Sequence, residues 1–149
     1  MLTYIEKNVP AIFKEEDIQN KKHTLKILSV DDDEMNQLLF TSLLSKLGYT
    51  CVTAKNGKQA VDMVLKEEFD IIFMDIYMPI MDGIEATFQI RNVLKTKQKP
   101  IIVALSANSF DDEKQKCIAA GMNDFMQKPY RLVAMEALLD KWNKQLHEN

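Results

Sequence analysis

The chain has 149 residues, a hydrophobic fraction of 46%, a charged fraction of 28% and a net charge of −3. These values are typical of one globular domain and exclude a wholly disordered chain, and the near-neutral charge argues against direct nucleic-acid binding. No apolar run approaches the roughly 20 residues that span a bilayer, and the two cysteines, Cys51 and Cys117, lack the close partners of a zinc site and are too few for a disulfide scaffold. We therefore expect a soluble, cytoplasmic protein with no membrane segment.

The first 23 residues differ in pattern from the rest of the chain. Their apolar residues are scattered, Pro10 interrupts them, and charged residues dominate from Lys14 to Lys22. We interpret residues 1–23 as an N-terminal extension or linker and residues 24–149 as the domain. A helix over residues 12–19 is an option that the sequence leaves open.

From Leu25 onward the pattern alternates between short β-rich runs and stretches with helical spacing. The predicted strands cover residues 25–30, 49–54, 70–75, 101–105 and 123–127. The predicted helices cover residues 35–47, 57–68, 84–94, 109–120 and 131–146, with Gly48 and Gly121 as C-terminal caps of the first and fourth. Five βα units with apolar strands predict an α/β fold, a parallel sheet covered by helices on both faces. An open doubly wound sheet fits this length, whereas a closed eightfold barrel needs more chain.

Helical spacing also predicts which side chains pack in the core. The apolar face of the second helix consists of Ala60, Val61, Val64 and Leu65. Several of the nine methionines, among them Met35, Met63 and Met135, stand at similar positions. We interpret them as core residues and not as copper ligands or as a partner groove.

Polar residues gather where the predicted strands end. Ligands of open parallel sheets bind outside these carboxyl ends. The residues there are Asp31, Asp32, Asp75, Ser106 and Lys128. Three carboxylates at one edge repel one another unless a cation lies among them, and hard oxygen ligands favour Mg²⁺ over zinc. A hydroxyl and an ammonium beside them suit stabilisation of a phosphoryl group that is transferred to a carboxylate.

Each of these residues also has an ordinary structural reading. An Asp such as Asp33 or Asp32 after a strand is often a helix N-cap, Ser106 alone is typical of a turn, and Lys128 alone is typical of a solvated surface. The joint placement on separate strand ends favours a functional site over independent accidents.

Four stretches resemble a response regulator receiver domain. They are residues 27–32, 73–83, 104–108 and 120–129, of which Met74-Asp75-Ile76-Tyr77-Met78-Pro79-Ile80-Met81-Asp82-Gly83 is the most specific. The resemblance runs from about Leu25 to Leu146, and the segment 120–124 is most similar to receivers of hybrid sensor histidine kinases. It implies a flavodoxin-like (βα)5 fold with the strand order 2-1-3-4-5.

The resemblance also implies roles for the residues at the strand ends. Asp75 is the phosphoacceptor, which takes the phosphoryl group from the phosphohistidine of a histidine kinase or a histidine phosphotransfer protein. The implied Mg²⁺ ligands are Asp31, Asp32, Asp75 and the backbone oxygen of Tyr77. Ser106 and Lys128 contact the phosphoryl group, and Lys128 also pairs with Asp75.

The same resemblance assigns a switch and two tuning positions. Ser106 moves inward after phosphorylation, and Phe125 follows it; core packing is the alternative for Phe125. Tyr77 and Asn108 flank the site, and we expect the bulky Tyr77 to slow hydrolysis of the phosphoryl-aspartate, unless its ring points to solvent. The bond before Pro129 is expected to be cis, as is frequent in the family.

Other function classes fit less well. A haloacid dehalogenase type phosphatase needs a second Asp two residues after the nucleophile, where this chain has Tyr77. A flavodoxin-like cofactor protein needs a phosphate-cradling glycine loop, which the four glycines do not form. A degenerate receiver that signals by binding alone is the remaining alternative. We expect no enzymatic activity other than catalysis of its own phosphorylation and dephosphorylation.

The sequence leaves the signalling context open. The domain could be a stand-alone regulator, a phosphorelay intermediate or a piece of a hybrid kinase, and no output domain is expected after Leu146. The first helix, with Asn36, Gln37 and Ser42 beside its leucines, is a plausible docking face for the histidine partner by family analogy. A phosphorylation-dependent dimer through the fourth helix, the fifth strand and the fifth helix is undecided.

Overall fold

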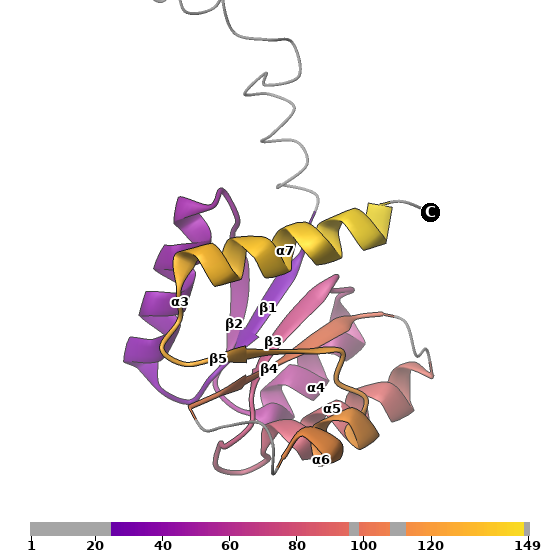
Figure 1. Ribbon diagram of the computed structural model, residues 1–149. Helices are drawn as coiled ribbons and strands as arrows, with labels where there is room; N and C mark the ends of the chain where they lie inside the picture. The colour runs from indigo at the N-terminus through magenta and orange to yellow at the C-terminus, as the bar shows by residue number, and fades with distance from the viewer. Residues whose placement is uncertain (1–24, 96–98, 108–112, 148–149) are drawn as a thin grey trace, which may run out of the picture.

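The computed structural model describes residues 25–95, 99–107 and 113–147 (Figure 1). The extension 1–23, the optional helix at residues 12–19 and Asn108 lie outside these ranges, so the predictions made for them stay predictions. None of the described helices combines the length and the apolarity needed to cross a bilayer.

Five parallel strands form one sheet in the order β2-β1-β3-β4-β5, which confirms the predicted doubly wound fold. The strands are β1 (Ile27–Val30), β2 (Cys51–Ala54), β3 (Ile71–Asp75), β4 (Ile101–Ser106) and β5 (Asp124–Gln127). The helices are α3 (Glu34–Lys46), α4 (Gly57–Lys66), α5 (Gly83–Leu94), α6 (Lys114–Ala120) and α7 (Leu132–His147). The bounds lie within a few residues of the predicted ones. α6 begins at Lys114, and residues 109–112 of the predicted fourth helix lie outside the described residues.

The helices cover the sheet in two layers, with α3 and α7 on one face and α4, α5 and α6 on the other (Figure 1). The central strands β1, β3 and β4 are buried along their whole length, and their side chains alternate between two core clusters. Ile27 packs toward Phe40 and Leu44 of α3, whereas Leu28 belongs to the cluster with Val61 and Ile90. The core therefore holds the ends of β1 and β3 firmly at the same edge.

Three expectations about burial are wrong. Val52 and Thr53 of β2 are exposed, because β2 is an edge strand with a neighbouring strand on one side only. Met35 is 73% exposed and Leu65 is 61% exposed. Both residues have the spacing of core residues. They lie at the edges of the apolar faces of α3 and α4, where no neighbouring element that the structure describes covers them.

Candidate functional site

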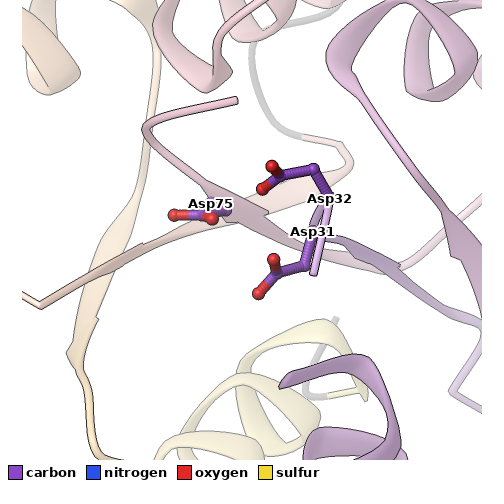
Figure 2. A group of neighbouring side chains, drawn as sticks. All are labelled: Asp31, Asp32 and Asp75. Carbon is purple, nitrogen blue, oxygen red and sulfur yellow. The ribbon is translucent and has the colours of Figure 1, made fainter. Parts of the chain in front are cut away.

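The acidic residues meet where β1 and β3 end. Val30 pairs with Met74, so the next residues of the two chain segments, Asp31 directly after β1 and Asp75 at the end of β3, lie side by side. Figure 2 shows their side chains together with that of Asp32, and one carboxylate oxygen from each lies within 4.8 Å of the others. Asp31 and Asp75 are 2% and 7% exposed, whereas Asp32 is exposed. The predicted cluster of three carboxylates is therefore present, and two of the three residues are shielded from water.

Lys128 reaches the cluster from the other side of β3. Its backbone N–H donates to the carbonyl of Ser106 at 2.8 Å, which fixes the start of the loop after β5. Its ammonium lies 3.5 Å from Oδ2 of Asp31 and 3.3 Å from Oδ2 of Asp75. One half-buried ammonium thus bridges two of the three carboxylates, and the pairing with Asp75 is the one that the resemblance implies.

The electrostatics of the site favour a further cation. Burial raises the pKa of Asp75 to about 6, and the charge of Asp31 acts in the same direction, while Lys128 opposes the rise. One ammonium cannot neutralise three carboxylates, so the cluster carries unbalanced negative charge. Hard oxygen donors in an accessible cluster with one exposed member fit Mg²⁺, which keeps several of its waters. The residues present therefore fit the predicted metal.

Ser106 ends β4 beside the acceptor. Its neighbour Leu105 pairs with Asp75, and the N–H of Ile76 donates to the carbonyl of Leu105 at 3.2 Å. Ser106 is 2% exposed. Ser106 therefore lies at the end of β4, as predicted, one register position beyond the residue that pairs with Asp75.

Gly83 allows α5 to begin directly behind Asp75. A Cβ atom at position 83 would lie only 2.1 Å from the carbonyl oxygen of Asp75, and such contacts do not occur. The N–H of Gly83 donates to the carbonyl of Ile76 at 2.8 Å, and Asp82 caps α5 by accepting from the N–H of Glu85 at 2.8 Å. The Asp82-Gly83 pair therefore shapes the loop after the acceptor and does not extend the acidic cluster.

The remaining predicted residues lie around the site. Asp33 is the N-cap of α3 and accepts from the N–H groups of Met35 and Asn36, so its structural reading is confirmed.

The predicted tuning residue Tyr77 is 59% exposed. Phe125 is half-buried against the cluster under α4 and α5, with the Lys114 ammonium 6.0 Å from its ring centre. The bond between Lys128 and Pro129 is cis, as expected.

Two residues near the site were not singled out as site residues from the sequence. Tyr130 packs edge-on against Phe40, and burial, together with Asp31 and Asp75, raises the pKa of its hydroxyl above the usual range. Gln37 was noted as a polar residue of the docking helix, but its side chain turns inward to the ends of β1 and β2. Nothing local in the sequence distinguishes Gln37 from a solvated glutamine, because its partners lie up to 17 residues away.

Known proteins resemble this chain over most of the described domain. The family model for the response regulator receiver domain matches residues 27–140. Hybrid signal transduction histidine kinase B of Dictyostelium discoideum is 46% identical over 116 residues, which cover 71% of this chain and 6% of that kinase. The chain thus spans only a small part of the curated relatives that it matches.

Two solved structures add similarity in three dimensions. The receiver domain of a Pseudomonas aeruginosa sensor histidine kinase, with a magnesium ion coordinated in its active site cleft, is 33% identical with a TM-score of 0.71, over 80% of this chain and 97% of that one. The receiver domain of the Saccharomyces cerevisiae response regulator Ssk1, in complex with the histidine phosphotransfer protein Ypd1, is 34% identical with a TM-score of 0.76, over 84% and 93%.

Proposed function

The chain belongs to the response regulator receiver domain family, and from this premise we propose that it accepts a phosphoryl group on Asp75 from a phosphohistidine of a partner protein. The relatives confirm the predicted likeness to receivers of hybrid histidine kinases. The observation that carries the proposal is the meeting of the three carboxylates with the Lys128 ammonium at one edge of the sheet. A degenerate, binding-only receiver is not favoured, because every group that the chemistry needs is present.

The transfer step uses Asp75 as the nucleophile. An ionised carboxylate oxygen of Asp75 attacks the phosphorus, the new P–O bond forms, and the P–N bond to the imidazole breaks. The leaving imidazole nitrogen takes a proton from solvent. Lys128, which pairs with both Asp75 and Asp31, pairs with the phosphoryl oxygens in the product, and the Ser106 hydroxyl donates to one of them. The chain acts on its own residue and turns over no free metabolite.

Magnesium is the proposed cofactor. Asp31, Asp32 and Asp75, with the backbone oxygen of Tyr77, are the groups that would hold it, and the magnesium-bound Pseudomonas receiver supports this assignment. When bound, the ion neutralises charge on the phosphoryl oxygens. Within the chain, burial raises the pKa of Asp75, and the Lys128 ammonium opposes that rise and favours the ionised carboxylate that the transfer needs.

The N-terminal half of α3 is the proposed docking face for the histidine partner. Met35, Leu38 and Leu39 are 73%, 61% and 48% exposed and follow directly after the acidic loop. Such an apolar patch beside the acceptor suits a partner that presents its histidine on an apolar helical surface. The complex of the yeast receiver with a histidine phosphotransfer protein supports a partner of this kind.

The switch and its output stay proposals as well. Phosphorylation adds about −1.5 to −2 charges at the edge of the sheet, which draws the Ser106 hydroxyl toward the phosphoryl group. Phe125 lies on the next strand and would respond to that movement. A phosphorylation-dependent dimer through α6, β5 and α7, and a cytoplasmic location, remain predictions.

The test is phosphorylation by a small donor. The protein is incubated with acetyl phosphate and Mg²⁺, and its intact mass is measured beside the Asp75→Ala variant and a sample with excess EDTA. We expect one added phosphoryl group that needs both Mg²⁺ and Asp75. An adduct that persists in Asp75→Ala would refute the assignment of the acceptor. If no adduct forms, a beryllofluoride titration distinguishes a short-lived phosphoform, which still binds, from a domain without the site.

A further inference from the structure

We propose that Gln37 is a positioning residue for the metal site, which fixes the backbone from which Asp31 and Asp32 project. The inference rests on the proposed function, since it concerns the cation that this site would hold. Gln37 lies on α3, six residues after Asp31, and touches no carboxylate in the contacts described below. Its effect on the metal would therefore be transmitted through the backbone of the acidic loop.

The side-chain amide of Gln37 is surrounded by backbone carbonyls. Its Nε2 lies 3.1 Å from the carbonyl oxygen of Ser29, 3.2 Å from that of Asp31 and 2.9 Å from that of Ala54. Its Oε1 accepts a hydrogen bond from the Ser29 hydroxyl at 2.8 Å. The amide orientation is therefore fixed, because a flipped amide would place its oxygen against three carbonyl oxygens.

These contacts lie where the β1–β2 ladder ends. The last pair of the ladder joins Val30 to Ala54, and the N–H of Asp31 still donates to the carbonyl of Ala54 at 3.1 Å. The described register between β1 and β2 extends no further than this pair. The side chain of Gln37 contacts carbonyl oxygens at the ends of both strands, and it thereby links them where the backbone pairing stops.

The acidic loop depends on this anchoring. The carboxylate of Asp31 accepts from the N–H of Asp33 at 2.9 Å, and the side chain of Asp33 caps the helix that carries Gln37. The loop is thus held at both ends, by the cap at Asp33 and by the Gln37 amide at Asp31. A neutral amide does so without adding charge: a Lys at this position would compete with the cation, and a carboxylate would add to the repulsion.

Groups that orient metal ligands influence affinity strongly. Loss of such a partner typically weakens metal binding by 10- to 100-fold. Gln37 acts on the backbone of two ligands and not on a ligand atom, so we expect an effect at the lower end, about a 10-fold rise in the Kd for Mg²⁺. A merely structural glutamine would lower the stability of the fold and leave the Kd of the folded protein unchanged.

The experiment measures Mg²⁺ binding by isothermal titration calorimetry for the unmodified protein and for Gln37→Met, which keeps the length of the side chain and removes the donors. Gln89→Met is the matched control, since the Gln89 amide bonds Glu85 within its own helix α5. Urea unfolding of each protein gives the stability separately. Hydrogen exchange of the Asp31 amide in metal-free protein reports the order of the loop without any ligand.

We expect Gln37→Met to raise the Kd about 10-fold and to speed exchange of the Asp31 amide, while Gln89→Met changes neither. A Kd within twofold of the unmodified protein would overturn the inference and leave the proposed function intact. If the unmodified protein does not bind Mg²⁺, the proposed function fails and the inference fails with it. If Gln37→Met does not fold, Gln37→Ala replaces it, because this variant removes the same three contacts of Nε2 without a thioether between the carbonyls. An unchanged Kd of the folded Gln37→Ala protein would likewise overturn the inference.

Discussion

Replacing Asp75 by Asn should stabilise the metal-free protein at neutral pH. The carboxyl group of Asp75 is 7% exposed, and burial raises its pKa from 3.8 to about 6 despite the nearby Lys128. The ionised form is therefore more costly in the folded protein than in the unfolded chain. Asn has the same shape without the charge, so the variant avoids this cost and leaves Lys128 paired with Asp31.

The size of the effect follows from the pKa difference. A rise from 3.8 to about 6 corresponds to about 3 kcal/mol, at about 1.4 kcal/mol per pKa unit. Between these two pH values the folded protein binds more protons than the unfolded chain, so the free energy of unfolding of the unmodified protein falls as the pH rises. The stabilisation by Asp75→Asn should be largest above pH 6 and vanish below pH 4.

Urea unfolding in the presence of EDTA measures this difference. Trp142, the single tryptophan, is half-buried with its Nε1–H donating to Asp124, so its fluorescence follows unfolding. Asp62→Asn is the control, because Asp62 is an exposed carboxylate on α4, and its replacement should change stability by less than about 0.5 kcal/mol. An Asp75→Asn variant that is no more stable than the unmodified protein at pH 7.5 would refute the reasoning. Added Mg²⁺ should reduce the stability difference between the two proteins, because the proposed site would bind the ion in the folded unmodified protein.

Three further predictions concern the loop after β3 and the docking face. Gly83→Ala should lower the free energy of unfolding by about 1–3 kcal/mol, because its Cβ would overlap the carbonyl of Asp75; a urea curve that matches the unmodified protein would contradict this. Tyr77→Ala should shorten the lifetime of the phosphoryl-aspartate, measured as loss of the added mass after donor removal, and an unchanged lifetime would show that the exposed ring does not hinder water. Leu38→Ser should slow phosphotransfer from a phosphohistidine partner several-fold and leave labelling by acetyl phosphate unchanged, because Leu38 is 61% exposed and belongs to the proposed docking face but not to the acidic cluster. Equal slowing with both donors would place the defect in the acceptor site and not in docking.

Much of the site could be predicted because its information is local. The change from period 2 to period 3.6 marks where each strand ends, and in a parallel sheet all such ends lie at one edge. Asp31, Asp75 and Lys128 could thus be brought together from their positions in the sequence alone. The three-dimensional contacts between Lys128 and the two carboxylates agree with that expectation.

Burial and long-range contacts, by contrast, depended on the packed structure. Spacing identifies an apolar stripe on a helix, but it does not tell which edge of the stripe a neighbouring element covers. For this reason the spacing predicts Met35 and Leu65 as core residues, whereas both are exposed in the structure. The Gln37 amide joins strand ends that are 8 and 17 residues away in sequence, and nothing local distinguishes it from a solvated glutamine. The need for glycine at position 83 arises from the carbonyl of Asp75, which approaches it only once α5 packs behind β3. The sequence by itself determined the fold and the chemical groups of the site, whereas packing decided how these groups are held. The reason is that the contacts that hold them form only between elements that have already folded against one another.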